Sequence, residues 1–106
     1  MRDFVLEHAD NLQFVVNYHS FANMLEIPYQ SEETAGTMTL AQSEAYSKIC
    51  EEAPLPPQMT CSNAIESLGY YVDGDFADWI LSKTGIVAMS PELGSSECSE
   101  TFCVAP

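Results

Sequence analysis

The sequence predicts an α/β fold, because two apolar runs have the character of buried strands. The runs are residues 12–20 (LQFVVNYHS) and residues 86–90 (IVAMS). The first is too apolar for a strand with one face in water, and strands covered on both faces occur in sheets that lie between helices. The chain has 106 residues, of which 46% are hydrophobic and 18% are charged, so we expect at most one globular domain.

The remaining elements of the first half follow from apolar spacing and composition. A second short strand is expected near residues 25–29, and the polar residues 30–39 indicate a loop. Residues 1–9 have the spacing of an amphipathic helix, and its apolar face consists of Met1, Phe4, Val5 and His8.

Capping residues mark two further helices. Thr39 and Gln42 form a capping box at the start of one helix, and prolines from Pro54 onward end it. Asp75 caps the other helix, and Gly85 follows its last turn. The buried stripe of the first of these helices is expected to consist of Ala45, Tyr46, Ile49 and Cys50.

The charge balance disfavours two classes of partner. Three Lys and Arg residues against sixteen Asp and Glu residues give a net charge of -13. Such a charge repels phosphate backbones and anionic lipids, so nucleic acid and membrane partners are not expected. No apolar run approaches the roughly 20 residues that a membrane-spanning helix needs.

The four cysteines are an even number in a short chain, which is typical of disulfide bonding. They allow three pairings, among which the sequence does not choose, and free thiols are the alternative. Disulfides form in oxidising compartments, so the expected location is secreted or vesicular. The cysteines are Cys50, Cys61, Cys98 and Cys103.

A histidine and a glutamate each stand at the end of an apolar run. His19 follows FVVNY, and Glu92 follows IVAMSP. In open α/β sheets, catalytic groups gather outside the carboxyl ends of strands. A zinc-binding histidine and a general base there would hydrolyse a peptide or an ester, because zinc lowers the pKa of water and a carboxylate takes the proton. The alternative is structural, with a hydrogen-bonded histidine and a solvated glutamate.

Two blocks of the sequence carry a more specific pattern. They are RDFVLEHADNLQFVVNYHSFANMLEIPY and GYYVDGDFADWILSKTGIVAMSPELG. The first resembles the helix, strand and His-Ser-aromatic segment of carboxypeptidase A-type zinc metallocarboxypeptidases. The second is similar to that family's tyrosine loop, Asp-Trp helix and final catalytic strand. The blocks lie in the family's order and span most of residues 2–94. The resemblance implies a mixed β-sheet flanked by helices, of which residues 1–106 form an incomplete, C-terminal portion.

The resemblance also implies roles for the two strand-end residues. His19 would be the third zinc ligand of the family's two-His-one-Glu site. Glu92 would be the general base that activates water and then delivers the proton to the leaving amine. The implied reaction is zinc-dependent removal of single residues from the C-termini of peptides and proteins.

Five further residues would bind the substrate. Tyr70 matches the mobile tyrosine that closes over the substrate, with the adjacent Tyr71 as the alternative. Ala77 matches the floor of the pocket for the last side chain, and an apolar floor favours aliphatic or aromatic residues. The remaining residues implied to line the substrate site are Ser20, Ile65 and Ser90.

The rest of the family's site is not in this sequence. The other two zinc ligands belong to a His-x-x-Glu motif, and neither His8 nor His19 is followed by glutamate at the third position. One imidazole does not hold a catalytic zinc ion, so the chain alone is expected to be inactive. A missing N-terminal half or an oligomer is expected to complete the site and cover the strand edges.

Two alternatives to the enzyme stay open. One is a non-catalytic, carboxypeptidase-like module that binds peptide ends or another protein. The joint presence of His19, Tyr70 and Glu92 favours the enzyme, because a binding module does not need a general base. The other alternative is a small acidic disulfide domain that is unrelated to peptidases.

Overall fold

The computed structural model of the chain describes residues 1–94. No helix in this range is long and apolar enough to cross a membrane. The elements in chain order are α1 (Arg2–His8), the 3-10 helix η1 (Ala9–Asn11), β1 (Phe14–Val16), β2 (His19–Ser20), β3 (Met24–Glu26), α2 (Leu40–Glu52), β4 (Thr60–Ser62), α3 (Ala64–Ser67), α4 (Phe76–Thr84) and β5 (Val87–Leu93).

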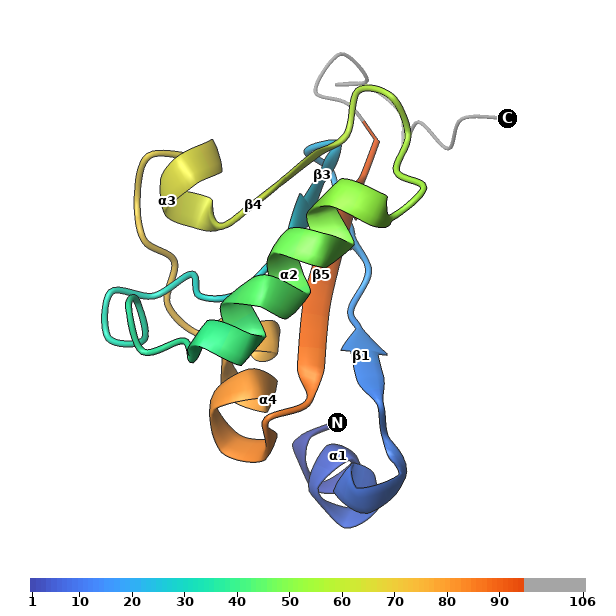
Figure 1. Cartoon of the computed structure of the whole chain (residues 1–106), viewed down its shortest axis with the longest axis vertical. Coiled ribbons are helices and arrows are strands. Elements are labelled where there is room, and N and C mark those ends of the chain that lie inside the picture. Colours follow the sequence, from blue (N-terminus) through green and yellow to red (C-terminus); the bar gives the residue numbers. More distant parts are fainter. Residues whose placement is uncertain (95–106) are drawn as a thin grey trace.

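Within residues 1–94 the strands form a mixed five-stranded sheet in the order β1-β5-β3-β4, with β2 also paired to β5 (Figure 1). β1 and β2 run parallel to β5, whereas β3 runs antiparallel to it. β4 runs parallel to β3. Helix α2 crosses one face of this sheet in Figure 1. The predicted α/β class, with a mixed sheet flanked by helices, is confirmed.

Strand β5 is longer than the sequence predicts. The sequence predicts a strand over residues 86–90 that ends at Pro91 and Glu92. The strand instead continues to Leu93, since it is paired on both sides at this point: His19 of β2 and Met24 of β3 are both partners of Glu92. Glu92 therefore lies inside a paired strand and not after it.

The prediction that residues 12–20 form a strand covered on both faces is wrong within the described chain. β1 lies at an edge of the sheet, and the side chain of Phe14 is 61% exposed. The run is also divided, because Asn17 and Tyr18 separate β1 from β2. Val15 packs against the core cluster that contains Ala88, whereas within residues 1–94 the side chain of Phe14 is left largely exposed.

Each side of the sheet has its own core, because successive residues of a strand point to opposite faces. Helix α4 contributes to both cores, through Ile80 on one side and Leu81 on the other. On the side of Ala88, the cluster consists of Val5, Ala77, Ile80, Ile86 and Ala88. On the side of Val87, the cluster consists of Tyr29, Tyr46 and Leu81.

Both predicted helix caps are confirmed. The Thr39 side chain accepts from the amide of Gln42, and the Gln42 side chain accepts from the amide of Thr39, which completes the capping box of α2. Asp75 accepts from the amide of Asp78 at the start of α4. Gly85 ends this helix with a φ of 73°, a left-handed conformation that glycine adopts without a steric penalty.

Tyr46, in the predicted stripe of α2, joins this helix to the middle of β5. Its side chain is 2% exposed. The hydroxyl donates to the carbonyl of Ala88 at 2.8 Å and accepts from the amide of Ala88 at 3.0 Å. β3 pairs with β5 only from Ser90 to Glu92. β1 pairs with β5 at Ala88 on one edge, so the Tyr46 hydroxyl satisfies both backbone groups of Ala88 on the other edge, which β3 does not reach.

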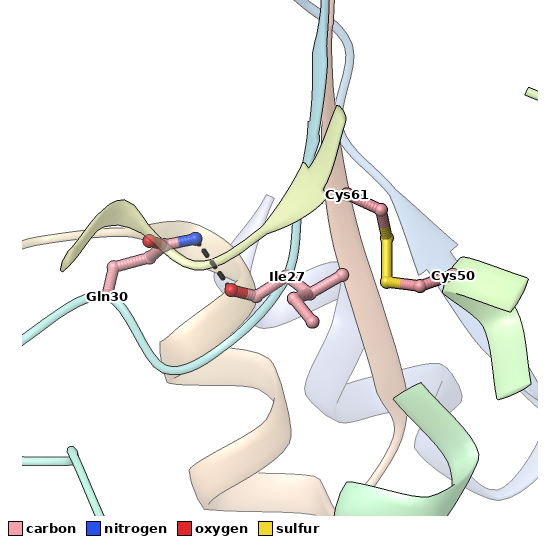
Figure 2. Close-up of a disulfide and its surroundings, with 4 residues drawn as sticks. All are labelled: Ile27, Gln30, Cys50 and Cys61. Atoms are coloured by element: carbon pink, nitrogen blue, oxygen red, sulfur yellow. Dashed lines mark hydrogen bonds between the residues drawn. A yellow bond between two sulfur atoms is a disulfide. The ribbon is translucent and has the colours of Figure 1, made fainter. Parts of the chain in front are cut away.

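A disulfide joins Cys50 at the end of α2 to Cys61 of β4 (Figure 2). It is one of the pairs that the sequence left open, and Cys98 and Cys103 lie outside the described residues. Neither β4 nor α3 was predicted, because elements of three and four residues are too short to show a period. Gln30 holds this region in place. Its side-chain nitrogen donates to the carbonyl of Ile27 at 2.8 Å (Figure 2). Its side-chain oxygen accepts from the backbone amide of Ala64.

Candidate active site

His19 and Glu92 come together because their strands pair in parallel. The register of β1 with β5 pairs Val16 with Met89, and β2 continues at the same offset, so that His19 and Glu92 are direct partners. Side chains of directly paired residues lie on the same face of a sheet. Nδ1 of His19 lies 4.0 Å from Oε1 of Glu92. The imidazole and the carboxyl group that the sequence singled out thus share one face and one site.

The histidine ring is oriented by Asn17, which the sequence analysis did not single out. The Asn17 side-chain amide lies 2.8 Å from Nε2 of His19. This contact occupies one ring nitrogen and leaves Nδ1 directed toward Glu92. The side-chain nitrogen of Asn17 only donates, so Nε2 accepts this hydrogen bond and the ring proton is on Nδ1. A metal-binding histidine instead donates the N–H of its second ring nitrogen to an acceptor. The alternation of a strand, which sets residues i and i+2 on one face, was the signal that could have identified Asn17.

A cleft of about 310 Å³ opens beside this pair. Two acidic residues that the sequence analysis missed, Glu26 and Asp73, line it. Glu26 is a charge within the apolar segment MLEIPY, and this interruption was the available signal. The complete lining consists of Asn17, His19, Glu26, Val72, Asp73, Gly74, Asp75, Phe76, Ser90 and Glu92.

The cleft concentrates negative charge. Burial raises the pKa of Glu26 above its usual value, and the nearby carboxylates of Glu92 and Asp75 raise it further. His19 acts in the opposite direction on the pKa of Glu26. These shifts follow from the cost of moving a carboxylate out of water and beside like charges.

The loop that carries the other wall of the cleft is anchored by Asp78. Its carboxylate accepts hydrogen bonds from the amides of Gln30 and Ser31 and from the hydroxyl of Thr34, at 2.9 to 3.1 Å. Burial raises the pKa of Asp78, and these hydrogen bonds oppose the rise. The amide of Val72 in turn donates to the carbonyl of Gln30 at 2.9 Å. Asp78 thus positions the cleft wall and does not line the cleft.

Three of the predicted site residues, His19, Ser90 and Glu92, line the cleft. Ala77, the predicted pocket floor, is 2% exposed and packs in the core with Val5 and Ile80. Ser20 is exposed on β2, beside Leu93 of β5.

The other two predicted site residues lie at the surface outside the cleft. Ile65 is 37% exposed on α3. Tyr70 is 59% exposed and Tyr71 is 42% exposed in the loop before α4. Neither tyrosine lines the cleft, so the choice between them as the closing residue stays a prediction.

Residues 1–94 fit one ligand position of a zinc site and not a complete site. They contain no group of three or more His, Cys, Asp or Glu side chains arranged to hold a metal ion. A catalytic zinc needs three protein ligands, and imidazole nitrogen is a common one. Nδ1 of His19 faces the cleft beside the carboxylate of Glu92. It can bind a metal ion only if the Asn17 amide turns over, so that the Asn17 oxygen accepts from Nε2–H and Nδ1 is free of its proton. The other ligands would have to come from elsewhere.

No protein-family model matches the chain, and no curated protein matches it.

Proposed function

We propose that this chain forms the C-terminal portion of a zinc metallocarboxypeptidase domain, which removes single residues from the C-termini of peptides or proteins. The observation that supports it most is the pairing of His19 with Glu92. The two residues are strand partners, and Nδ1 lies 4.0 Å from Oε1. A zinc ligand and a general base need to reach the same water molecule, and these two side chains face the same cleft.

Glu92 is the proposed general base. Its side chain is 18% exposed, and the strand on each side of it fixes its backbone. It takes a proton from the water that attacks the last peptide carbonyl. When the carbon–nitrogen bond breaks, it returns that proton to the leaving amine.

His19 is the proposed zinc ligand, through Nδ1. This role requires the Asn17 amide to turn over, so that its oxygen accepts from Nε2–H and the lone pair of Nδ1 is available to the ion. Bound zinc supplies the Lewis acidity that such a hydrolysis needs. The affinity of one imidazole is too low to retain the ion, so the proposal requires a His-x-x-Glu segment outside these 106 residues. The exposed Phe14 at the β1 edge is consistent with a surface that a further segment or a second copy covers. The Cys50–Cys61 disulfide is in keeping with a secreted or vesicular location.

The experiment is to express the polypeptide encoded by the complete gene, including any coding sequence upstream of Met1, and to measure release of the C-terminal residue from blocked dipeptides. Glu92→Gln is expected to lower kcat by at least about 100-fold while zinc content stays near that of the wild type. His19→Ala is expected to lower zinc content, measured by atomic absorption after dialysis.

Glu44→Gln is the matched control, because Glu44 is exposed on α2 and away from the cleft. It should change neither kcat nor zinc content. The 106-residue chain by itself should hydrolyse no more substrate than its own Glu92→Gln variant. Full turnover in the long Glu92→Gln protein, or full zinc occupancy in His19→Ala, would show that the assignment is wrong. Retained peptide binding without any turnover in the wild type would favour the non-catalytic binding module.

A further inference from the structure

The inner wall of the cleft is acidic, and the register of the sheet creates it. Glu26 of β3 pairs directly with Ser90 of β5, and Ser90 is two residues before Glu92 on the same strand. All three side chains therefore share one face of the sheet and line the same cleft. Glu26 therefore lies beside Ser90, which is two residues along β5 from Glu92, the proposed general base.

Ser90 gives this wall an unused hydrogen-bonding group. The residue is 1% exposed, and within residues 1–94 its hydroxyl oxygen has no hydrogen-bond partner. A buried polar atom is nearly always satisfied, and leaving one unpaired destabilises the folded state. Ser90 lines the cleft, so a ligand that enters the cleft can supply the missing partner.

The remaining charges of the cleft have the same sign. Asp73 and Asp75 line it from the loop before α4, and within the described residues no lysine or arginine lines it. Burial together with Glu92 and Asp75 raises the pKa of Glu26, which means that the ionised carboxylate is held at an electrostatic cost. A cation bound beside Glu26 would offset this cost, whereas an apolar or anionic group would not.

We propose that the cleft binds a cationic side chain, so that the substrates are peptides with a C-terminal lysine or arginine. This inference rests on the proposed function, which identifies the bound group as the last residue of a peptide. Glu26 is the counter-ion of the bound cation, with Asp73 at the entrance, and the hydroxyl oxygen of Ser90 accepts a hydrogen bond from it. The apolar floor that the sequence indicated at Ala77 does not decide the preference, because Ala77 packs in the core and does not line the cleft.

The test measures binding to the 106-residue chain without zinc, so its result does not depend on catalysis. The probes are Nα-acetyl-L-lysine and Nα-acetyl-L-norleucine, which share the same four-carbon side chain and differ by the ammonium group. Affinity is measured by titration of amide chemical shifts, with those of Glu26 and Ser90 reporting the site. The lysine probe is expected to bind at least about tenfold more tightly, which is the effect of one hydrogen-bonded charge.

Three variants separate a specific counter-ion from the general field of an acidic protein. Glu26→Gln should weaken the lysine probe about tenfold and leave the norleucine probe unchanged. Glu44→Gln removes the same charge from the exposed face of α2 and should change neither affinity. Asp73→Asn, at an exposed position, should weaken the lysine probe by a smaller factor and provides a second measurement if Glu26→Gln does not fold.

Equal affinities for the two probes, or no saturable binding of the lysine probe, would overturn the inference. Equal losses in Glu26→Gln and Glu44→Gln would do the same, since they would mean that only net charge attracts the probe. None of these outcomes affects the peptidase proposal, which depends on turnover and zinc content in the longer protein. Conversely, a preference for the lysine probe would stand as binding specificity even if the longer protein had no peptidase activity.

Discussion

Replacing Tyr46 by phenylalanine tests the contact between α2 and β5, the strand that carries Ser90 and Glu92. The substitution removes one oxygen atom and leaves the ring. It also leaves the amide and the carbonyl of Ala88 without their partner, in a position where Tyr46 is 2% exposed. An unsatisfied buried backbone group costs about 1–3 kcal/mol. Because a carbonyl tolerates the loss better than an amide does, we expect the free energy of unfolding to fall by about 2–4 kcal/mol in total.

The assay is urea unfolding followed by the fluorescence of Trp79, which packs against the core on the side of Ala88. Tyr18→Phe is the matched control, because Tyr18 is 68% exposed, and this control should change the free energy by less than about 0.5 kcal/mol. Equal slopes of free energy against urea in the three proteins would show that the same surface is exposed on unfolding. A loss in Tyr46→Phe no larger than that in Tyr18→Phe would refute the reasoning.

Three further predictions concern stability. Burial raises the pKa of Tyr46 to about 12, so the hydroxyl of the unfolded chain loses its proton at a lower pH than that of the folded chain. The free energy of unfolding should therefore fall by about 2–3 kcal/mol as the pH rises from 10 to 12. Tyr46→Phe should not show this pH dependence in urea titrations. Burial raises the pKa of Glu26 above 4.5, so its contribution is present below pH 4.5 and lost as the pH rises through the folded-state value. Glu26→Gln should therefore be more stable than the wild type at pH 7 and not at pH 3, as thermal unfolding would show. The double substitution of Cys50 and Cys61 by serine should cost about 3 kcal/mol by the loop-entropy relation for a separation of 11 residues; a transition midpoint unchanged from that of the oxidised wild type would contradict this.

The local elements that carry a signal within a few residues were predictable. The capping box of Thr39 and Gln42 and the caps at Asp75 and Gly85 lie where the sequence indicates, since each depends on contacts within one helical turn. β4 and α3 were missed because they are too short to show a period. The end of β5 was misplaced, because Pro91 indicates a strand end, whereas pairing on both sides extends the strand to Leu93.

The candidate site was predictable in part. His19 and Glu92 could be singled out because each polar group follows an apolar run, and Ser90 because of a family resemblance. Glu26 could not be assigned to the cleft, since its place there depends on the pairing of β3 with β5 between segments far apart in the chain. Ala77 was wrongly assigned to the substrate pocket, because it lies with Ile80 on the face of α4 that packs in one core cluster with Val5.

The sequence by itself determined the α/β class, the helix ends and the two side chains on which the peptidase proposal depends. These features follow from short-range physics, in which a residue's neighbours within a few positions set its conformation and its tendency to be buried. Only the tertiary structure decided which strands pair, in which direction and in which register. That register sets the imidazole of His19 beside the carboxylate of Glu92 and adds the charge of Glu26 to their cleft, because side chains from distant segments meet only after the sheet has formed.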